Sequence, residues 1–182
     1  MKFYDKLESH HHEFIAAQKM FFVGSAPLAG DGHVNVSPKG LDSLVVLGDN
    51  RVAYIDLGGS GIETQAHMRE NGRLCMMFCA FEGNPLIMRL YGRGIAHPYG
   101  TAGYDELRDL FPAVTVPVRG IIELEISDVQ DSCGWGVPLY DFVGDRKLLT
   151  HHNGSRTQDE HMERRYLTNE TSIDGLPGLT RP

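Results

Sequence analysis

The chain has 182 residues, of which 41% are hydrophobic and 23% are charged, and its formal net charge at pH 7 is −7. This length and composition are typical of one folded domain with a single core, and they exclude disorder over most of the chain. The basic residues are scattered along an acidic chain, so the sequence lacks the basic patch of a nucleic-acid-binding protein.

In chain order, hydrophobic periodicity and turn residues predict strands interspersed with short helices. Helices are expected over 9–19, 61–70, 104–111 and 156–167, and strands over 20–26, 33–39, 43–47, 51–57, 74–81, 86–96 and 119–127. Ser9 is the expected N-cap of the first helix, and Ser155 with Gln158 has capping-box spacing before the last. The tail, residues 171–182, has turn chemistry throughout, which predicts an arm on the surface or a disordered end.

The strand over 33–39 is the first candidate for ligand contact. Alternation places Val34 and Val36 on one face and Asn35 and Ser37 on the other. Pro38 lacks an N–H group, so the strand must end there or lie at a sheet edge, which leaves backbone groups free. Lys39 is the one cation of the stretch, and the plainer interpretation is a solvated residue before the turn.

The corner between the strand over 51–57 and the helix over 61–70 is the second candidate. Ser60 stands three residues before Glu63, which is capping-box spacing, and glycines flank it at 58, 59 and 61. Free N–H groups and the dipole at a helix start attract anions, and glycine allows a ligand to approach the backbone. Capping without any ligand explains the same spacing, and spacing alone favours it.

Carboxylates and histidines supply weaker candidates. Glu123 and Glu125 alternate with apolar residues, so we expect them on an exposed sheet face and not as an acid–base pair. The histidines could form a metal site, but no HExxH-like spacing occurs, and we expect surface or interface residues without a metal. They are His10, His11, His12, His151, His152 and His161.

The expected location is cytoplasmic. The start of the chain lacks the apolar segment of a signal peptide, and no stretch approaches the roughly eighteen apolar residues of a membrane span. Cys75, Cys79 and Cys133 are odd in number and lack CxxC spacing, which favours reduced thiols in a reducing compartment. We expect Cys75 and Cys79 to be core residues.

Three runs together resemble the FMN-binding split-barrel proteins related to pyridoxamine 5'-phosphate oxidase. They are HVNVSPKG at 33–40, VAYIDLGGSGIETQAHMRENGRLCMMFCAF at 52–81 and MRLYGRG at 88–94. The resemblance implies a mainly β (α+β) domain, an antiparallel split β-barrel of about six strands with flanking helices. It further implies a flavin-binding barrel over 1–130, with the aromatic loop, helix and arm of 131–182 packed on the same domain. A homodimer with the flavin at the subunit interface is expected.

The resemblance also implies the cofactor FMN and its binding residues. Lys39 matches the lysine that ends the family's flavin-phosphate strand, and backbone N–H groups around Ser37 to Lys39 would contact the ring near N5. Ser60 or Thr64 could hydrogen-bond phosphate oxygens, although plain helix capping is the alternative. Trp135 lies between two glycines as a core plug or a lid over the ring. The expected cofactor-binding residues are Asn35, Val36, Ser37, Pro38, Lys39, Tyr54, Ile55, Asp56, Ser60, Gly61, Thr64, Gln65 and Trp135.

The sequence departs from the family at the phosphate site. The family has an arginine at the start of the lysine strand and a serine–arginine–lysine cluster at the helix start, where this chain reads VNVSPK and GSGIETQ. Fewer cations and the nearby acid Glu63 argue against pyridoxamine phosphate oxidation as the activity. We expect FMN-dependent oxidoreduction of a small molecule, with no catalytic side chain assigned. The alternatives are a non-catalytic carrier of flavin or haem, a deazaflavin in place of FMN, and a histidine-based metal protein.

Overall fold

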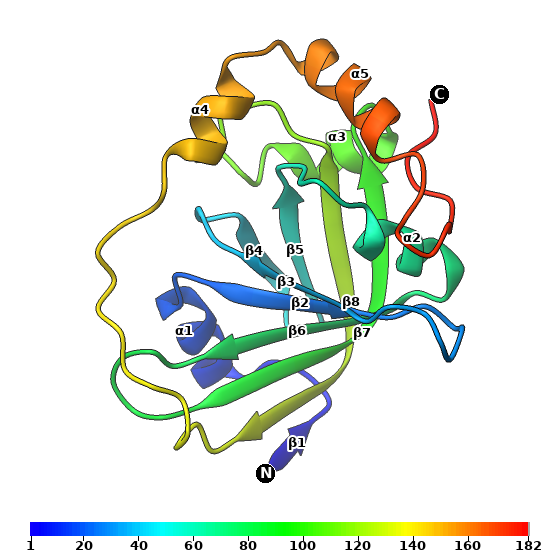
Figure 1. The fold of residues 1–182 in the computed structure, drawn as a ribbon. Coiled ribbons are helices and arrows are strands. Elements are labelled where there is room, and N and C mark those ends of the chain that lie inside the picture. Colours follow the sequence, from blue (N-terminus) through cyan, green and yellow to red (C-terminus); the bar gives the residue numbers. More distant parts are fainter. Residues whose placement is uncertain (182) are drawn as a thin grey trace.

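The computed structural model describes residues 1–181, and Pro182, the last residue of the predicted arm, lies outside them. The described chain forms strands and short helices (Figure 1). The strands are β1 (Lys2–Tyr4), β2 (Phe21–Ser25), β3 (Asn35–Lys39), β4 (Leu44–Gly48), β5 (Arg51–Asp56), β6 (Arg73–Cys79), β7 (Ile87–Pro98) and β8 (Gly120–Ser132). The helices are α1 (Ser9–Ala17), α2 (Glu63–Glu70), α3 (Ala102–Arg108), α4 (Leu148–Gly154) and α5 (Gln158–Thr168).

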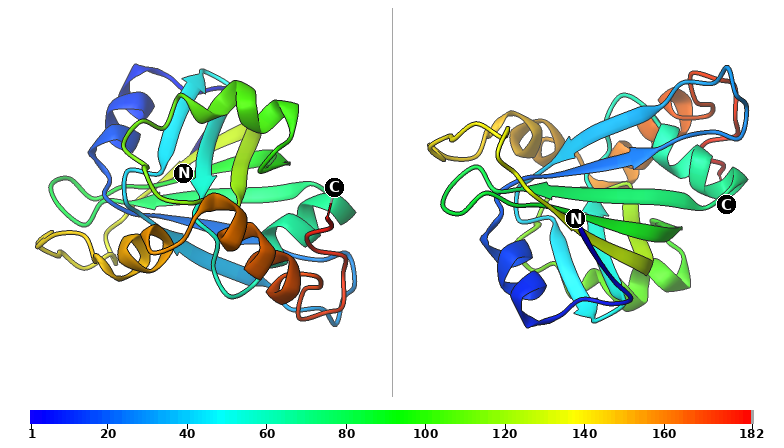
Figure 2. Two further views of the ribbon diagram at one scale, coloured as in Figure 1. Left: turned by 90° about the horizontal axis from the view of Figure 1, so that it is seen from above. Right: turned by 90° about the horizontal axis from the view of Figure 1, so that it is seen from below.

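The strands form one curled, antiparallel sheet of eight strands in the order β3-β2-β6-β7-β8-β5-β4, with β1 added to β8. Figures 1 and 2 show the sheet curling so that its two end strands, β3 and β4, come round toward each other. The predicted split β-barrel is confirmed, although the expected number of about six strands is too low. None of the helices within residues 1–181 has the length and apolar character needed to cross a membrane.

The long strands β7 and β8 bend at Gly92. Their register shifts between Tyr91 and Gly92, as in a β-bulge. A Cβ atom at Gly92 would overlap the carbonyl oxygen of Glu125, so only glycine fits this crossing. In the sequence, Gly92 and Gly94 predict a bend or bulge of the strand expected over 86–96, and the bulge at Gly92 is confirmed. The bulge lets β7 and β8 contribute to both sides of the curled sheet.

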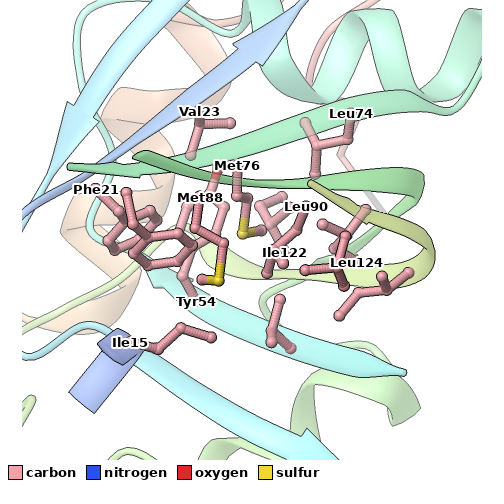
Figure 3. Close-up of a cluster of buried hydrophobic side chains, with 14 of the residues drawn as sticks. Ile15, Phe21, Val23, Tyr54, Leu74, Met76, Met88, Leu90, Ile122 and Leu124 are labelled. Atoms are coloured by element: carbon pink, nitrogen blue, oxygen red, sulfur yellow. The ribbon is translucent and has the colours of Figure 1, made fainter. Parts of the chain in front are cut away.

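Two apolar clusters fill the two faces of the sheet. The inner cluster lies inside the curl and includes Ile15, Phe21, Val23, Tyr54, Leu74, Met76, Met88, Leu90, Ile122 and Leu124 (Figure 3). The outer cluster joins β5 and β8 to α3 and the loop after it, through Ala53, Ile55, Tyr104, Phe111, Val114, Val118 and Ile121. The strands β5 and β8 are therefore covered on both faces.

This cover on the outer face corrects the expectation for Glu123. Glu123 is only 4% exposed. Its carboxylate accepts a hydrogen bond from Arg51 Nε at 2.6 Å and lies 3.0 Å from His97 Nε2. Glu125 is exposed as expected. Strand alternation separates the two faces correctly, but it cannot show that α3 covers one of them.

Helix starts differ from the capping predictions in three places. The N-cap of α1 is Glu8, which forms a capping box with His11, and α5 is capped by Thr157 and Glu160 instead of Ser155 and Gln158. The N-cap of α2 is Ile62, without a side-chain hydrogen bond, so Ser60 is not the cap. The sequence patterns also did not predict β1 and α4, which are too short to show periodicity.

Candidate functional site

The lysine strand, β3, lies at the split of the barrel. Asn35 Nδ2 donates to Thr64 Oγ1 at 2.9 Å and to Ser25 Oγ at 3.1 Å, which ties β3 to α2 and β2. At the other end of β3, Lys39 Nζ lies 5.8 Å from the centre of the Tyr54 ring on β5. The structure thus brings together Asn35 with Thr64, and Lys39 with Tyr54.

The outer edge of β3 carries free backbone groups. In the β2–β3 ladder Pro38 lies opposite Phe22, and a residue without an N–H cannot form the doubly hydrogen-bonded type of pair. The bonded pairs are therefore those of Ser37 and Lys39, and the backbone of Val36 faces the open edge. The N–H available to a ligand is that of Val36, which corrects the expectation that those of Ser37 and Lys39 are free.

Asp56, at the end of β5, is the centre of a buried polar cluster. Its carboxylate accepts from Arg119 Nη2 at 2.8 Å and Nε at 3.0 Å, from Gln65 Nε2 at 3.1 Å and from the Gly58 N–H at 3.0 Å. Burial alone would raise the pKa of Asp56, but the charges of Arg119 and Lys39 and the Gly58 hydrogen bond lower it to about 2. Asp56 is therefore ionised, and its carboxylate oxygens are already hydrogen-bonded to Arg119 and Gln65 and are not free for a ligand.

The glycine corner, residues 57–61, is held by the C-terminal part of the chain. Four of its backbone carbonyl oxygens accept hydrogen bonds of 2.6–3.1 Å from side chains. Asn153 Nδ2 donates to Leu57 O, Arg165 Nη1 to Gly59 O, Asn169 Nδ2 to Ser60 O, and Arg119 Nη1 to Gly61 O. These four partners were missed in the sequence, because nothing local marks residues that lie 58 to 109 positions away from the groups they bind. The corner is foremost a docking site for α4, α5 and the residues after α5.

Three side chains lie against the glycines of the corner. Gly58 has φ +74°, and a Cβ atom there would lie 3.1 Å from His161 Nε2 and 3.3 Å from Arg165 Nε. At Gly61 the same position is taken by the carboxylate of Glu63, which also accepts from the Ile173 N–H at 3.3 Å. An acid therefore already stands beside the start of α2, where the sequence motif predicted an anion.

Lys39, at the end of β3, is a half-buried cation of the site. Burial lowers its pKa, Asp56 raises it and Arg119 lowers it further. Arg119 takes the ion pair with Asp56, and within residues 1–181 no carboxylate lies at ion-pair distance from Lys39 Nζ. A partly desolvated ammonium without a counter-ion is costly unless an anion joins it.

A cavity of about 590 Å³ adjoins the Lys39 end of β3. One wall is Pro38, Lys39 and Gly40, and the opposite wall is a segment that we call the strap, residues 134–147. The strap is anchored by the Tyr140 N–H, which donates to Phe81 O at 3.0 Å, and by Phe142, whose ring centre lies 5.9 Å from Lys19 Nζ. The volume and the aromatic lining are typical of sites for small planar ligands.

Two expected site residues lie elsewhere. The Ile55 side chain belongs to the outer apolar cluster, on the face of β5 opposite to Tyr54. Trp135 is 84% exposed at the start of the strap and is neither a core plug nor a lid within its own subunit.

His10, His11 and Asp131 are the described residues whose ligand atoms come close enough for a metal, all within 4.8 Å of one another. The Glu8 N–H, however, donates to His11 Nδ1 at 2.9 Å, so the neutral ring carries its proton on Nε2. It is Nε2 that faces Asp131, at 3.4 Å, and a protonated nitrogen cannot bind a metal. The cluster is better explained as a close polar contact between α1 and β8.

Comparison with known proteins places the chain in a family. It is 40% identical over 195 aligned positions to the pyridoxamine 5'-phosphate oxidase family protein ustO of Aspergillus flavus, covering 97% of this chain and 77% of ustO. The chain belongs to the pyridoxamine 5'-phosphate oxidase family, as the sequence motifs indicated. No family model matches the sequence.

Solved structures agree on the fold. The Group A Streptococcus protein HupZ superposes with a TM-score of 0.55 over 69% of this chain and 93% of its own, at 16% identity. A Lactobacillus delbrueckii protein described as a candidate pyridoxamine 5'-phosphate oxidase superposes with a TM-score of 0.52 over 70% of this chain and 95% of its own, at 15% identity. Both share the split barrel, and at these identities they indicate the fold alone.

Proposed function

We propose that this chain binds a flavin, specifically FMN, at the open edge of β3 and uses it in the oxidoreduction of a small molecule. Family membership supports a flavin, and the observation that carries the proposal is Lys39, a half-buried cation at the end of β3 with no carboxylate at ion-pair distance within residues 1–181. One lysine at the end of β3 suits one phosphate group better than the diphosphate of FAD. A bound flavin would supply the electron transfer.

The residues at the edge of β3 have separate roles in this proposal. Lys39 holds the phosphate, the Val36 N–H donates to the polar rim of the ring, and the Asn35–Thr64 hydrogen bond keeps β3 and α2 together. The cavity between Lys39 and the strap excludes water from one side of the ligand. Asp56 and Gln65 support the site without contacting the ligand, because Asp56 accepts hydrogen bonds from both Arg119 and Gln65. None of these groups is assigned as a general acid or base.

We further propose that two copies of the chain associate, with the flavin site at their interface. The strap supports this, because it holds large apolar side chains that are mostly exposed, with Trp135 84%, Leu139 74% and Val143 97% exposed. The cytoplasmic location and the division at residue 130 stay predictions.

The test is a titration of the purified protein with FMN and with riboflavin, followed by flavin fluorescence. Lys39→Gln should weaken FMN binding roughly 10- to 100-fold, about 1–3 kcal/mol, and leave riboflavin binding nearly unchanged, because only FMN carries the phosphate. Lys6→Gln, an exposed lysine paired with Asp49, is the matched control.

Equal FMN affinity in wild type and Lys39→Gln would show that Lys39 is not part of the site. If neither FMN nor riboflavin binds, the assignment of a flavin cofactor is wrong. Bleaching of the bound flavin by NADH or NADPH would support the enzyme over a carrier that only holds the cofactor.

A further inference from the structure

A chain of hydrogen bonds runs from the start of β3 into the interior. Asn35 Nδ2 donates to Thr64 Oγ1 and to Ser25 Oγ, and Ser25 Oγ lies 3.0 Å from His67 Nδ1. Ser25 stands opposite Asn35 in the β2–β3 ladder, so the two side chains point to the same face of the sheet. The helix α2 supplies His67 and Thr64 to that face, and it is thereby connected to the strand that carries the proposed ligand site.

His67 is the buried end of this chain of bonds. It is 0% exposed, and among residues 1–181 no group bonds to its Nε2. Burial lowers the pKa of His67 below the ordinary value of 6.5, so the ring is neutral at pH 7. The contact with Ser25 is therefore the hydrogen bond that this buried ring makes in the described part of the chain.

The direction of each bond follows from the protons that are present. Ser25 accepts from Asn35 Nδ2, so its single hydroxyl proton is free for His67 Nδ1, and His67 then carries its own proton on Nε2. With the proton on Nδ1 instead, Ser25 would accept from His67. The hydroxyl proton of Ser25 would then find an acceptor in Asn35 only after the amide had turned over.

The orientation of the Asn35 amide decides which atom a ligand meets. Its Nδ2 is directed at Thr64 and Ser25, so the remaining polar atom is Oδ1. Within residues 1–181 this oxygen accepts no hydrogen bond, and it does not belong to the buried polar atoms that lack a partner, so solvent reaches it. An acceptor here suits an N–H or O–H group of a ligand, whereas a phosphate oxygen would be repelled.

We infer that His67 is a positioning residue of the proposed ligand site. Its unprotonated Nδ1 acts through Ser25 and holds the Asn35 amide with Oδ1 presented to the ligand, where it selects a hydrogen-bond donor on the flavin ring or its hydroxylated chain. The inference rests on the proposed function for its ligand, and it adds a residue that does not itself contact that ligand.

The first test needs no ligand and uses NMR spectra of the ¹⁵N-labelled full chain at pH 7. His67 should show a protonated Nε2 and an unprotonated Nδ1, and the Asn35 side-chain NH₂ should exchange slowly with solvent because its protons are bonded. His67→Phe should speed this exchange on the order of tenfold or more. His67→Asn should restore slow exchange, because its carbonyl oxygen can accept from Ser25 in place of Nδ1.

His11→Phe is the matched control for these spectra. His11 is an equally buried histidine, it lies on α1, and it has no bond to Asn35 or Ser25. The replacement may be compared directly with His67→Phe, because both remove a buried imidazole and keep an aromatic ring. Asn35 exchange should stay as in wild type.

The second test is a titration with FMN and riboflavin. Ser25→Ala and His67→Phe should each weaken the binding of both flavins to the same extent, roughly five- to tenfold, because the two flavins differ only in the phosphate. The double variant should be no weaker than either single variant, since both replacements interrupt the same chain of bonds. Lys39→Gln, in contrast, should affect FMN alone.

The outcomes separate this inference from the proposed function. A wild-type protein that binds neither flavin overturns the proposed function and the effect of His67 on a ligand, and the exchange rates still decide whether His67 orients Asn35. Three results would overturn the inference while flavin binding stands: a proton on Nδ1 of His67, an Asn35 exchange rate that is equal in His67→Phe and wild type, or flavin affinities that are equal in His67→Phe and His11→Phe.

Discussion

At the scale of single residues, Lys39 and Glu63 act on an anion in opposite directions. Lys39 ends β3 without an acidic partner within residues 1–181, whereas the Glu63 carboxylate lies against Gly61 at the start of α2. An FMN phosphate held by Lys39 would be repelled through space by the Glu63 carboxylate. Glu63 should therefore limit how strongly the chain prefers FMN to riboflavin.

Glu63→Gln should raise the affinity for FMN by roughly fivefold, about 1 kcal/mol, and leave that for riboflavin unchanged. The amide keeps an oxygen that can accept from the Ile173 N–H, so the fold should be little affected. Paired titrations with the two flavins measure the ratio, and Glu106→Gln on exposed α3 surface is the control. A ratio equal to that of wild type would show that Glu63 does not act on the phosphate and would contradict this role.

At the scale of elements, α5 decides the shape of the site although it contributes no expected ligand contact. The Thr157–Glu160 capping box starts the helix, and its buried face places His161 and Arg165 against Gly58. Burial, with the positive charges of Arg165 and Arg119, lowers the pKa of His161 to about 4. The packing of α5 on the glycine corner therefore requires a neutral imidazole.

This makes α5 sensitive to acid. The pKa of His161 is about 4 in the folded chain, against the ordinary histidine value of 6.5, so the unfolded chain binds the proton more tightly. Its contribution to stability is complete above pH 6.5 and is lost as the pH falls toward 4. Between pH 7 and pH 5 the loss is about 2 kcal/mol.

Urea unfolding at pH 7 and pH 5 measures this effect. His161→Gln should reduce the difference in the free energy of unfolding between the two pH values by about that amount. His11 and His67 are buried with lowered pKa values and keep part of the pH dependence in both proteins, so the informative quantity is the difference between them. His151→Gln, which is exposed, should behave as wild type; an unchanged pH dependence in His161→Gln would contradict the assignment.

At the scale of the whole molecule, Arg119 joins parts of the chain that are far apart in sequence. Its guanidinium bonds the end of β5 at Asp56, the glycine corner at Gly61 O and the C-terminal part at Asn169 Oδ1. The residues after α5 then return over α2, where Arg69 donates to Gly178 O and Asp174 accepts from His33. The tail is thus an ordered arm over residues 171–181, one of the two forms expected from its turn residues.

Arg119→Met should lower the free energy of unfolding by about 3–5 kcal/mol, because it leaves the Asp56 carboxylate buried without its cation. The urea midpoint measures the loss, and Arg164→Met at an exposed position of α5 should stay within about 0.5 kcal/mol of wild type. Asp56→Asn combined with Arg119→Met should recover part of the loss, since no buried charge then remains. An Arg119→Met midpoint equal to that of the control would contradict a central role for this cluster.

The sequence alone determined the features that depend on near neighbours. Alternation and turn residues located most of the helices and strands, Pro38 predicted the edge strand β3, and Gly92 predicted the bulge, because each acts through its own backbone. The three motifs identified the family for the same reason, since they are continuous runs of residues.

Only the tertiary structure decided what covers those elements. Glu123 is buried on the sheet face on which α3 packs, with Arg51 and His97 against its carboxylate. The glycine corner is closed because α4, α5 and the chain after α5 bring Asn153, His161, Arg165 and Asn169 onto it. Free N–H and C=O groups in a sequence attract a ligand and a distant side chain equally well. The choice between them is made by contacts between segments about a hundred residues apart, and local patterns contain no information about such contacts.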